Sequence, residues 1–221
     1  MAKAPKPKRP DARPHVRFPA MLRVDYPGPG GRPAFAYTSH VSAGDLLLRA
    51  GLKEGEPLEL TVSLGTREQA LALKGTVRGP EGDGTVLVVL DPDQEEALQQ
   101  LRAFIEKQYV KKLEEAVARS PRAADKALEL AGYYVEVERG SDAVEVLRKT
   151  AQTSPQNLAV AELLGEQLFL LLATDPGQAP LLAELEALVE QARPLGKSDV
   201  LSRVAAHLAD LRQQAQRRRN E

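Results

Sequence analysis

Hydrophobic and polar residues alternate with a period of two along residues 21–90. The clearest case is residues 57–64, where Leu58, Leu60, Val62 and Leu64 are separated by Glu59, Thr61 and Ser63. This alternation predicts strands with one face in a core and one face in water. Because closure removes exposed strand edges, six short strands indicate a small antiparallel barrel. The predicted strands cover residues 21–26, 34–41, 45–49, 57–64, 71–77 and 85–90.

After residue 91 the period changes to that of a helix. Asp91 or Asp93 is expected to cap a helix that ends near Ser120 and covers an open end of the barrel with its first turns. The rest of the chain has the same helical pattern, so the predicted fold class is α+β. The apolar stripe of this first helix consists of Leu98, Leu101, Ile105, Tyr109, Leu113 and Val117.

The helical half repeats weakly at a spacing of about 34 residues. Residues 124–157 resemble one tetratricopeptide repeat, with Gly140 at the turn between its two helices. The next unit departs from that pattern, because the position of the expected small residue falls on Gly177 within the turn sequence Asp175-Pro176-Gly177, and Val189 stands where a proline is expected. A plain helical bundle therefore remains the alternative. The repeated positions are Ala127, Leu130, Ala131 and Tyr134, followed by Ala161, Leu164, Gly165 and Leu168.

These patterns divide the chain into four parts. We expect a basic, flexible N-terminal arm over residues 1–17 and a barrel over residues 18–91. A linking helix follows over residues 92–119, and a helical, tetratricopeptide-like domain with a basic tail over residues 120–221.

The distribution of charge separates the two ends of the chain from its body. The net charge is −1, yet residues 1–17 carry six basic side chains against one acidic, and residues 212–221 carry four against one. The proline-rich arm has too few large apolar groups to offset the entropy of ordering. It is either a solvated tail or an arm that closes over an anion such as a phosphate, which the planar donors of arginine suit.

Composition disfavours most enzymes. The chain has no cysteine, and its three histidines leave little for metal binding or acid–base chemistry. No phosphate-binding Walker loop or nucleophile elbow occurs. The low aromatic content of 4% and the acidic body make nucleic-acid binding an unfavoured interpretation, limited to a weak, salt-sensitive contact of the tails. No apolar run approaches the ~20 residues that span a bilayer, so we expect no membrane insertion and a cytoplasmic location.

Two short motifs carry the strongest functional signal. Arg13 and Arg17 stand four residues apart just before the first predicted strand, and His40, Ser42, Gly44 and Asp45 surround the corner between the second and third strands. Together they resemble the PilZ domain family over roughly residues 12–106, most closely the PilZ-like domains of deltaproteobacterial regulators. That family is a six-stranded barrel with a following helix, and it typically binds cyclic di-GMP through Arg-x-x-x-Arg and Asp/Asn-x-Ser-x-x-Gly.

The resemblance implies a role for each candidate residue. Arg13 and Arg17 would wrap the dinucleotide, Ser42 would add a hydroxyl, and Gly44 would supply part of the flexibility of the family's glycines. However, His40 replaces the family's Asp or Asn, and Asp45 replaces its last Gly. If each change loses ~1.5 kcal/mol, binding weakens by roughly a hundredfold or more.

Three interpretations of these motifs follow. The barrel is a PilZ-like domain that still binds cyclic di-GMP, a PilZ-like domain that has lost this ligand and acts through protein contacts, or an unrelated barrel. The sequence favours the second, with a protein partner bound by the helical domain. The expected function is therefore that of a non-catalytic bacterial signalling adaptor with no certain cofactor and no metal. By resemblance, the regulated process includes motility among other possibilities. The alternative is a cyclic di-GMP receptor whose arginine arm closes on the dinucleotide.

Overall fold

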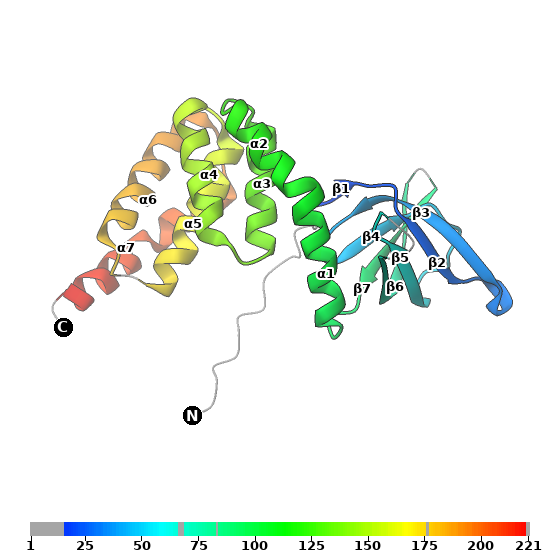
Figure 1. The fold of residues 1–221 in the computed structure, drawn as a ribbon. Helices are drawn as coiled ribbons and strands as arrows, with labels where there is room; N and C mark the ends of the chain where they lie inside the picture. The colour runs from blue at the N-terminus through cyan, green and yellow to red at the C-terminus, as the bar shows by residue number, and fades with distance from the viewer. Residues whose placement is uncertain (1–15, 66–68, 83, 176, 220–221) are drawn as a thin grey trace. The chain divides into compact units, whose positions relative to one another are not determined.

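The computed structural model of the 221-residue chain describes residues 16–65, 69–82, 84–175 and 177–219. The chain divides into two compact units, residues 1–105 and residues 106–221 (Figure 1). The first unit contains all of the described strands, and the second contains helices alone. Among the helices in the described ranges, none combines the length and the apolar character needed to cross a membrane.

The first unit is a closed antiparallel barrel of six strands, as the alternation of the sequence predicts. Their order is β3-β2-β5-β6-β7-β4, and β4 pairs again with β3 to close the sheet. A seventh, two-residue strand, β1, pairs with the end of β3. The strand bounds are β1 Phe18–Pro19, β2 Arg23–Pro27, β3 Pro33–Val41, β4 Asp45–Leu48, β5 Pro57–Ser63, β6 Ala70–Gly82 and β7 Thr85–Leu90.

Strands β5 and β6 show how the alternating pattern forms the barrel. Leu58, Leu60 and Val62 of β5 are buried, while the residues between them are exposed or half-buried. Leu71 and Leu73 of β6 are buried as well, and they lie opposite Val62 and Leu60 in the sheet register. Side chains that face each other across two strands share one side of the sheet, so these residues fill the barrel interior together.

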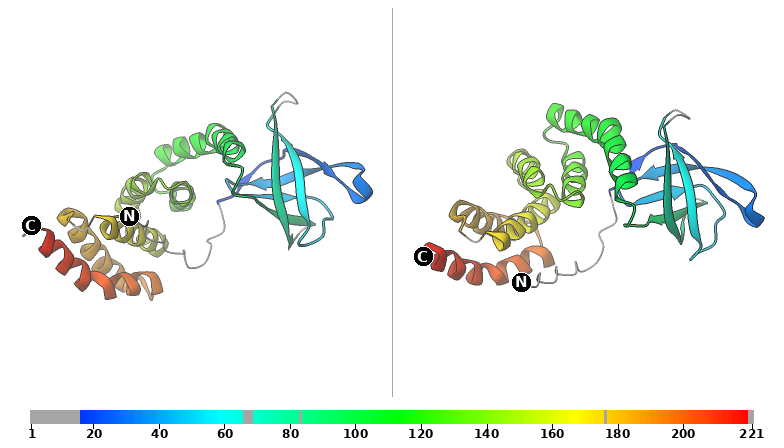
Figure 2. Two further views of the ribbon diagram at one scale, coloured as in Figure 1. Left: turned by 90° about the horizontal axis from the view of Figure 1, so that it is seen from below. Right: turned by 60° about the horizontal axis from the view of Figure 1, so that its bottom comes forward.

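The β2–β3 hairpin extends past the rest of the barrel, as both views of Figure 2 show at the blue end of the ribbon. Thr38 anchors its base, because this side chain is buried and its hydroxyl donates to the Ala20 carbonyl at 2.5 Å and accepts the Leu22 N–H at 2.9 Å. One hydroxyl therefore satisfies two backbone groups of the segment between β1 and β2, where the ladder is interrupted.

Helix α1, Glu95–Ile105, packs on β6 of the barrel. Gln94, and neither Asp91 nor Asp93, directly precedes it, which corrects the predicted aspartate cap. The Gln94 side chain accepts the Lys74 N–H at 2.8 Å and donates to the Lys74 carbonyl at 2.6 Å. The Gln94 amide thus forms the same two hydrogen bonds with Lys74 that a paired strand residue would form. These bonds hold the chain at the point where it leaves the barrel.

The apolar stripe predicted for residues 98–117 shifts by one position partway along. Leu98, Leu101 and Ile105 are buried as expected, but the next buried residue is Val110, whereas Tyr109 is half-buried. The cause is a π-helical turn, η2 (Glu106–Val110), between α1 and α2 (Lys111–Arg119). A π-turn contains one more residue than an α-turn, so a stripe spaced at 3.6 residues is displaced by one.

The second unit continues with five helices that pack in sequence. Helices α3 to α6 each pack on the next, and α7 packs against both α5 and α6. Helix α5 is the central one, in contact with α3, α4, α6 and α7, which explains why its sequence is apolar on most sides. The helix bounds are α3 Ala124–Glu136, α4 Gly140–Thr153, α5 Leu158–Thr174, α6 Ala179–Ala192 and α7 Asp199–Arg219.

Helices α3 and α4 occupy the stretch that resembles a tetratricopeptide repeat. Ala143 and Leu147 of α4 are buried, at the positions where the sequence pattern requires core residues. The turn differs from the expectation for Gly140, which is simply the first residue of α4. Glu138 instead adopts the left-handed conformation that ends α3, with φ of 63°. The assignment to the repeat family stays a prediction.

Candidate functional site

The corner between β3 and β4 is a two-residue turn that Ser42 and Asp45 close. The Ser42 N–H donates to the Asp45 carbonyl at 2.9 Å. The Ser42 hydroxyl accepts the Asp45 N–H at 2.8 Å and the Gly44 N–H at 3.2 Å. Both Ser42 and Asp45 are buried. Serine hydroxyls commonly satisfy N–H groups a few residues ahead in this way, so the corner forms from local sequence.

The carboxylate of Asp45 receives three donors. The Ser42 hydroxyl lies 2.9 Å from Asp45 Oδ1, Arg17 Nε donates to Oδ1 at 2.9 Å, and Arg17 Nη2 donates to Oδ2 at 3.0 Å. The Asp45 side chain is only 3% exposed and that of Arg17 is 20% exposed. A buried carboxylate without a partner is strongly unfavourable, and here a two-bonded guanidinium compensates its charge.

This ion pair joins the N-terminal segment to the β3–β4 corner. Arg17 directly precedes β1, which pairs with β3 at Val41 and His40. The structure thus brings Arg17, Ser42 and Asp45, three of the six candidate residues, into one bonded cluster. Two of the five guanidinium donors of Arg17 are engaged by a carboxylate of the same chain. Their role as a ligand site stays a prediction.

Gly44 and His40 stand beside this cluster in different ways. Gly44 contributes backbone only, since its N–H donates to Ser42 and its carbonyl accepts the Leu90 N–H at 2.9 Å. His40 is half-buried on β3, with Nδ1 3.3 Å from the Ser39 hydroxyl. Within the described ranges no hydrogen bond joins His40 to Ser42 or Asp45. The position where a PilZ-like motif carries a carboxylate or amide is thus not part of the network.

Arg13, the sixth candidate residue, lies outside the described residues, as does most of the predicted N-terminal arm over residues 1–17. The expectation that Arg13 binds a ligand together with Arg17 therefore stays a prediction. Arg17 is the member of the pair whose position the structure gives.

Sequence reasoning missed the Arg17–Asp45 pair and the position of two aromatic rings. Phe35 and Tyr37 are 56% and 42% exposed on the outer side of β3. A signal was present in the hairpin, because Phe35 lies opposite Asp25, and Tyr37 lies opposite Arg23. Residues opposite each other share a face of the sheet, so two charged partners on β2 indicate the outer face.

Comparisons with known structures found two partial matches. The structure of the Bacillus subtilis inhibitor of motility, MotI/DgrA, is 20% identical, with a TM-score of 0.34 over 46% of this chain. The chain covers 53% of that protein, about half its length. The PilZ domain of CeSA from a cellulose-synthesizing bacterium is 19% identical, with a TM-score of 0.32 over 38% of this chain and 92% of that domain.

A comparison with curated proteins gave no match. The family model described as PilZ domain matches residues 11–107. This stretch contains every strand of the described residues, the Arg17–Asp45 pair and helix α1, and it ends within η2. The barrel and its first helix are thus the part of the chain that is similar to the PilZ domain, and the helices beyond residue 107 lie outside the matched stretch.

Proposed function

We propose that this protein is a non-catalytic signalling adaptor whose PilZ domain acts through protein contacts and has lost strong binding of cyclic di-GMP. The observation that carries the proposal is the ion pair between Arg17 and the buried carboxylate of Asp45. In the family pattern Arg17 would hold the ligand, and position 45 would be a glycine without any side chain. Here that position supplies an anion of its own to the same guanidinium.

The carboxylate of Asp45 weakens the binding of a dinucleotide, whichever of two arrangements the ligand takes. A ligand phosphate must either break the two hydrogen bonds between Arg17 and Asp45 or share the guanidinium with a negative charge nearby. Two like charges about 5 Å apart in a partly exposed site repel by roughly 3 kcal/mol at an effective dielectric constant of about 20. This energy alone corresponds to a loss of affinity of more than a hundredfold.

The replacement at position 40 acts in the same direction. A histidine ring offers one donor or acceptor on each nitrogen and cannot form the paired hydrogen bonds of a carboxylate or amide with a guanine edge. His40 is also directed toward Ser39 and is not joined to the Ser42 cluster. Both departures from the family pattern thus support a domain that no longer depends on the dinucleotide.

The helical unit is the proposed site of a protein partner. Its helices form a stack of neighbouring pairs, and the two complete helices α3 and α4 support the resemblance to a tetratricopeptide repeat. Leu170 of the central helix α5 remains 50% exposed, so part of this apolar helix faces outward. We place the protein in the bacterial cytoplasm, with motility among the processes that it would regulate.

Calorimetric titration of the full chain with cyclic di-GMP tests this proposal. The parent protein is expected to give no binding heat at micromolar concentrations. The double variant His40→Asp, Asp45→Gly restores the family pattern and is expected to gain binding, because it frees Arg17 and supplies a carboxylate for the guanine edge. Adding Arg17→Ala to this double variant should remove the gain.

The alternative function is a cyclic di-GMP receptor, which the nearness of Arg17 to Ser42 favours. It requires micromolar heat from the parent protein that disappears in Arg13→Ala and in Arg17→Ala. Such heat would overturn the adaptor proposal. If the restored double variant binds no better than the parent, the explanation based on Asp45 is wrong.

A further inference from the structure

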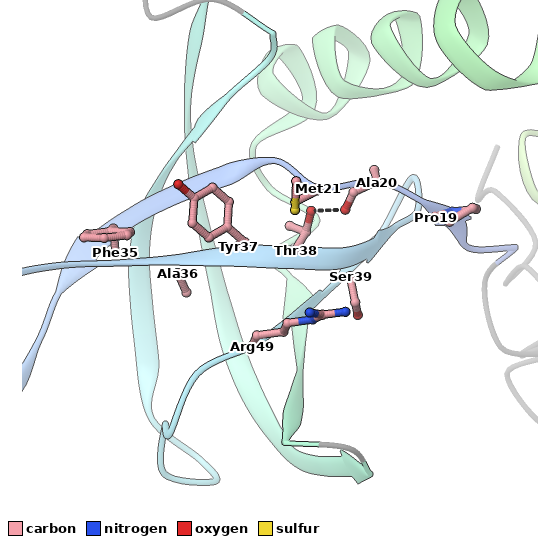
Figure 3. Close-up of a pocket in the computed structure, with 9 residues that line it drawn as sticks. All are labelled: Pro19, Ala20, Met21, Phe35, Ala36, Tyr37, Thr38, Ser39 and Arg49. Carbon is pink, nitrogen blue, oxygen red and sulfur yellow. Dashed lines mark hydrogen bonds between the residues drawn. The ribbon is translucent and has the colours of Figure 1, made fainter.

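Three of the four large apolar side chains that are exposed in the described residues lie together on the barrel. Met21, Phe35 and Tyr37 are 79%, 56% and 42% exposed, and with Ser39 and Arg49 they line a shallow depression of about 480 Å³. Figure 3 shows the two rings and Met21 along the hairpin, and Arg49 extending toward Ser39. We call these five residues the β3 patch. Single exposed apolar residues are ordinary, but a cluster with a polar rim is typical of an interaction surface.

The β3 patch lies beside an open strand edge. Strand β2 pairs with residues 33–37 of β3 on one side, whereas β4 pairs only from Thr38 onward on the other. The last contact on that side is the Arg49 N–H, which donates to the Tyr37 carbonyl at 2.9 Å. Before that point, no strand among the described residues covers β3 on the β4 side.

The backbone of Phe35 is directed toward this open edge. The Thr38 N–H donates toward β2, to the Leu22 carbonyl, while the Tyr37 carbonyl accepts from Arg49 on the opposite side. Backbone groups of successive residues alternate between the two sides of a strand. Phe35 therefore presents its N–H and carbonyl to the uncovered edge, with its exposed ring next to them. An extended peptide can continue the sheet at such an edge.

Charge indicates which extended peptide fits. Arg49 is exposed, and it forms no ion pair within the described ranges. Arg23 forms an ion pair with Asp25 at 2.7 Å, and its guanidinium also lies over the Phe35 ring, 4.5 Å from the ring centroid. Arg32 is exposed near the hairpin tip. The surroundings of the patch are thus basic overall. A second copy on the same edge would bring these arginines together, so complementarity favours an acidic segment.

We propose that the β3 patch binds an extended segment of a partner protein that carries alternating apolar side chains and at least one carboxylate. The segment adds a strand at Phe35, places apolar side chains against Met21 and Tyr37, and pairs its carboxylate with Arg49. This inference rests on the proposed function as an adaptor, and it assigns the PilZ domain a protein contact of its own.

Selection of phage-displayed random 12-residue peptides on the full chain tests this inference. Enriched peptides are expected to alternate apolar residues with polar ones and to contain Asp or Glu. A synthetic version should lose at least tenfold in affinity with Tyr37→Ser and with Arg49→Glu, measured by fluorescence polarisation. Arg78→Glu replaces an exposed arginine on β6, and this matched control should leave the affinity unchanged. All three substitutions lie at exposed or partly exposed positions, and unchanged melting temperatures check the fold.

The backbone contact has its own readout. Methylation of the peptide nitrogens at alternate residues should abolish binding in one of the two registers and not in the other, because only one set of N–H groups faces β3. Selection that yields no acidic–apolar peptide, or peptides that bind Tyr37→Ser as well as the parent, would overturn the inference. So would sedimentation of the parent as a dimer that Tyr37→Ser dissociates, since a second copy would then occupy the edge. Binding heat from cyclic di-GMP would instead count against the proposed function and leave the peptide result standing.

Discussion

Arg17 and Asp45 form a two-bonded ion pair that is almost closed to solvent on the Asp45 side, with contacts of 2.9 and 3.0 Å. The pair connects the segment before β1 to the first residue of β4, and Ser42 completes the set of donors to the carboxylate. An arginine that the family pattern assigns to a ligand is thus part of the fold in this chain. Under the proposed function, this contact is the reason why Arg17 no longer serves a ligand.

Thr38→Val should lower the free energy of unfolding by about 2 kcal/mol, because the Ala20 carbonyl and the Leu22 N–H both lose their partner in a buried position. Urea titration of the full chain measures this loss. Thr38→Ser keeps the hydroxyl and serves as the control, with a smaller loss expected. Equal losses in both variants would show that packing of the methyl group matters and the hydrogen bonds do not.

Gly75→Ala should destabilise the barrel by about 2 kcal/mol through overpacking. A Cβ at this position of β6 would lie 2.6 Å from the Val89 carbonyl oxygen, which belongs to the backbone of β7 and cannot simply rotate away. Gly51→Ala is the matched control, since nothing lies within 4 Å of a Cβ there. Similar melting temperatures for the two variants would contradict the close approach of β6 and β7.

Glu138→Gly should raise the free energy of unfolding by about 1 kcal/mol, since Glu138 holds a left-handed conformation with φ of 63° that costs non-glycine residues energy. Guanidinium unfolding followed by circular dichroism, which reports the helices, measures the gain. Glu145→Gly, inside α4, should instead destabilise by about 1 kcal/mol. Destabilisation by Glu138→Gly would mean that this turn is not left-handed at residue 138.

We predict that Tyr134 makes the free energy of unfolding fall in alkaline solution. Burial, together with the hydrogen bond from its hydroxyl to Glu114, raises the pKa of Tyr134 above its ordinary value of about 10. Below pH 10 both folded and unfolded chains keep the phenol protonated, so this contribution to stability is complete. As the pH rises above 10, the unfolded chain releases the proton first and stability falls.

Comparison of the parent with Tyr134→Phe between pH 8 and pH 11 isolates this effect. Burial also raises the pKa of Tyr109, but Tyr109 is present in both proteins and its contribution cancels. The free energy of unfolding of the parent should fall more steeply above pH 10 than that of Tyr134→Phe. Parallel curves would argue against the buried hydrogen bond to Glu114.

The sequence predicts the fold well wherever one local pattern decides it. The strict alternation of β5 places Leu58, Leu60 and Val62 in the core, and the structure confirms this. The π-turn at residues 106–110 could not be predicted, because it leaves the apolar period intact on each side and displaces only the phase between Ile105 and Val110. Periodicity measures spacing within a helix and carries no information about one inserted residue.

The candidate site could likewise be predicted from the sequence only in part. The approach of the N-terminal segment to the Ser42 corner followed from the motif pattern, but the pairing of Arg17 with Asp45 did not, since it joins residues 28 positions apart. The sequence indicates Asp45 only as a replacement that weakens ligand binding, whereas its contact with Arg17 depends on the β1–β3 register. Long-range ion pairs of this kind depend on the register of the sheet, which the sequence pattern alone does not determine.

A double-mutant cycle on the full chain tests the engagement of Arg17 by Asp45 most directly. The free energy of unfolding is measured for the parent, Arg17→Ala, Asp45→Ala and the double variant, and the exposed pair Arg23–Asp25 provides the matched control cycle. We predict a coupling energy of about 2 kcal/mol for the buried pair and less than about 1 kcal/mol for the exposed pair. Additive losses for Arg17→Ala and Asp45→Ala would contradict the account, because they would mean that Asp45 does not hold Arg17 in solution.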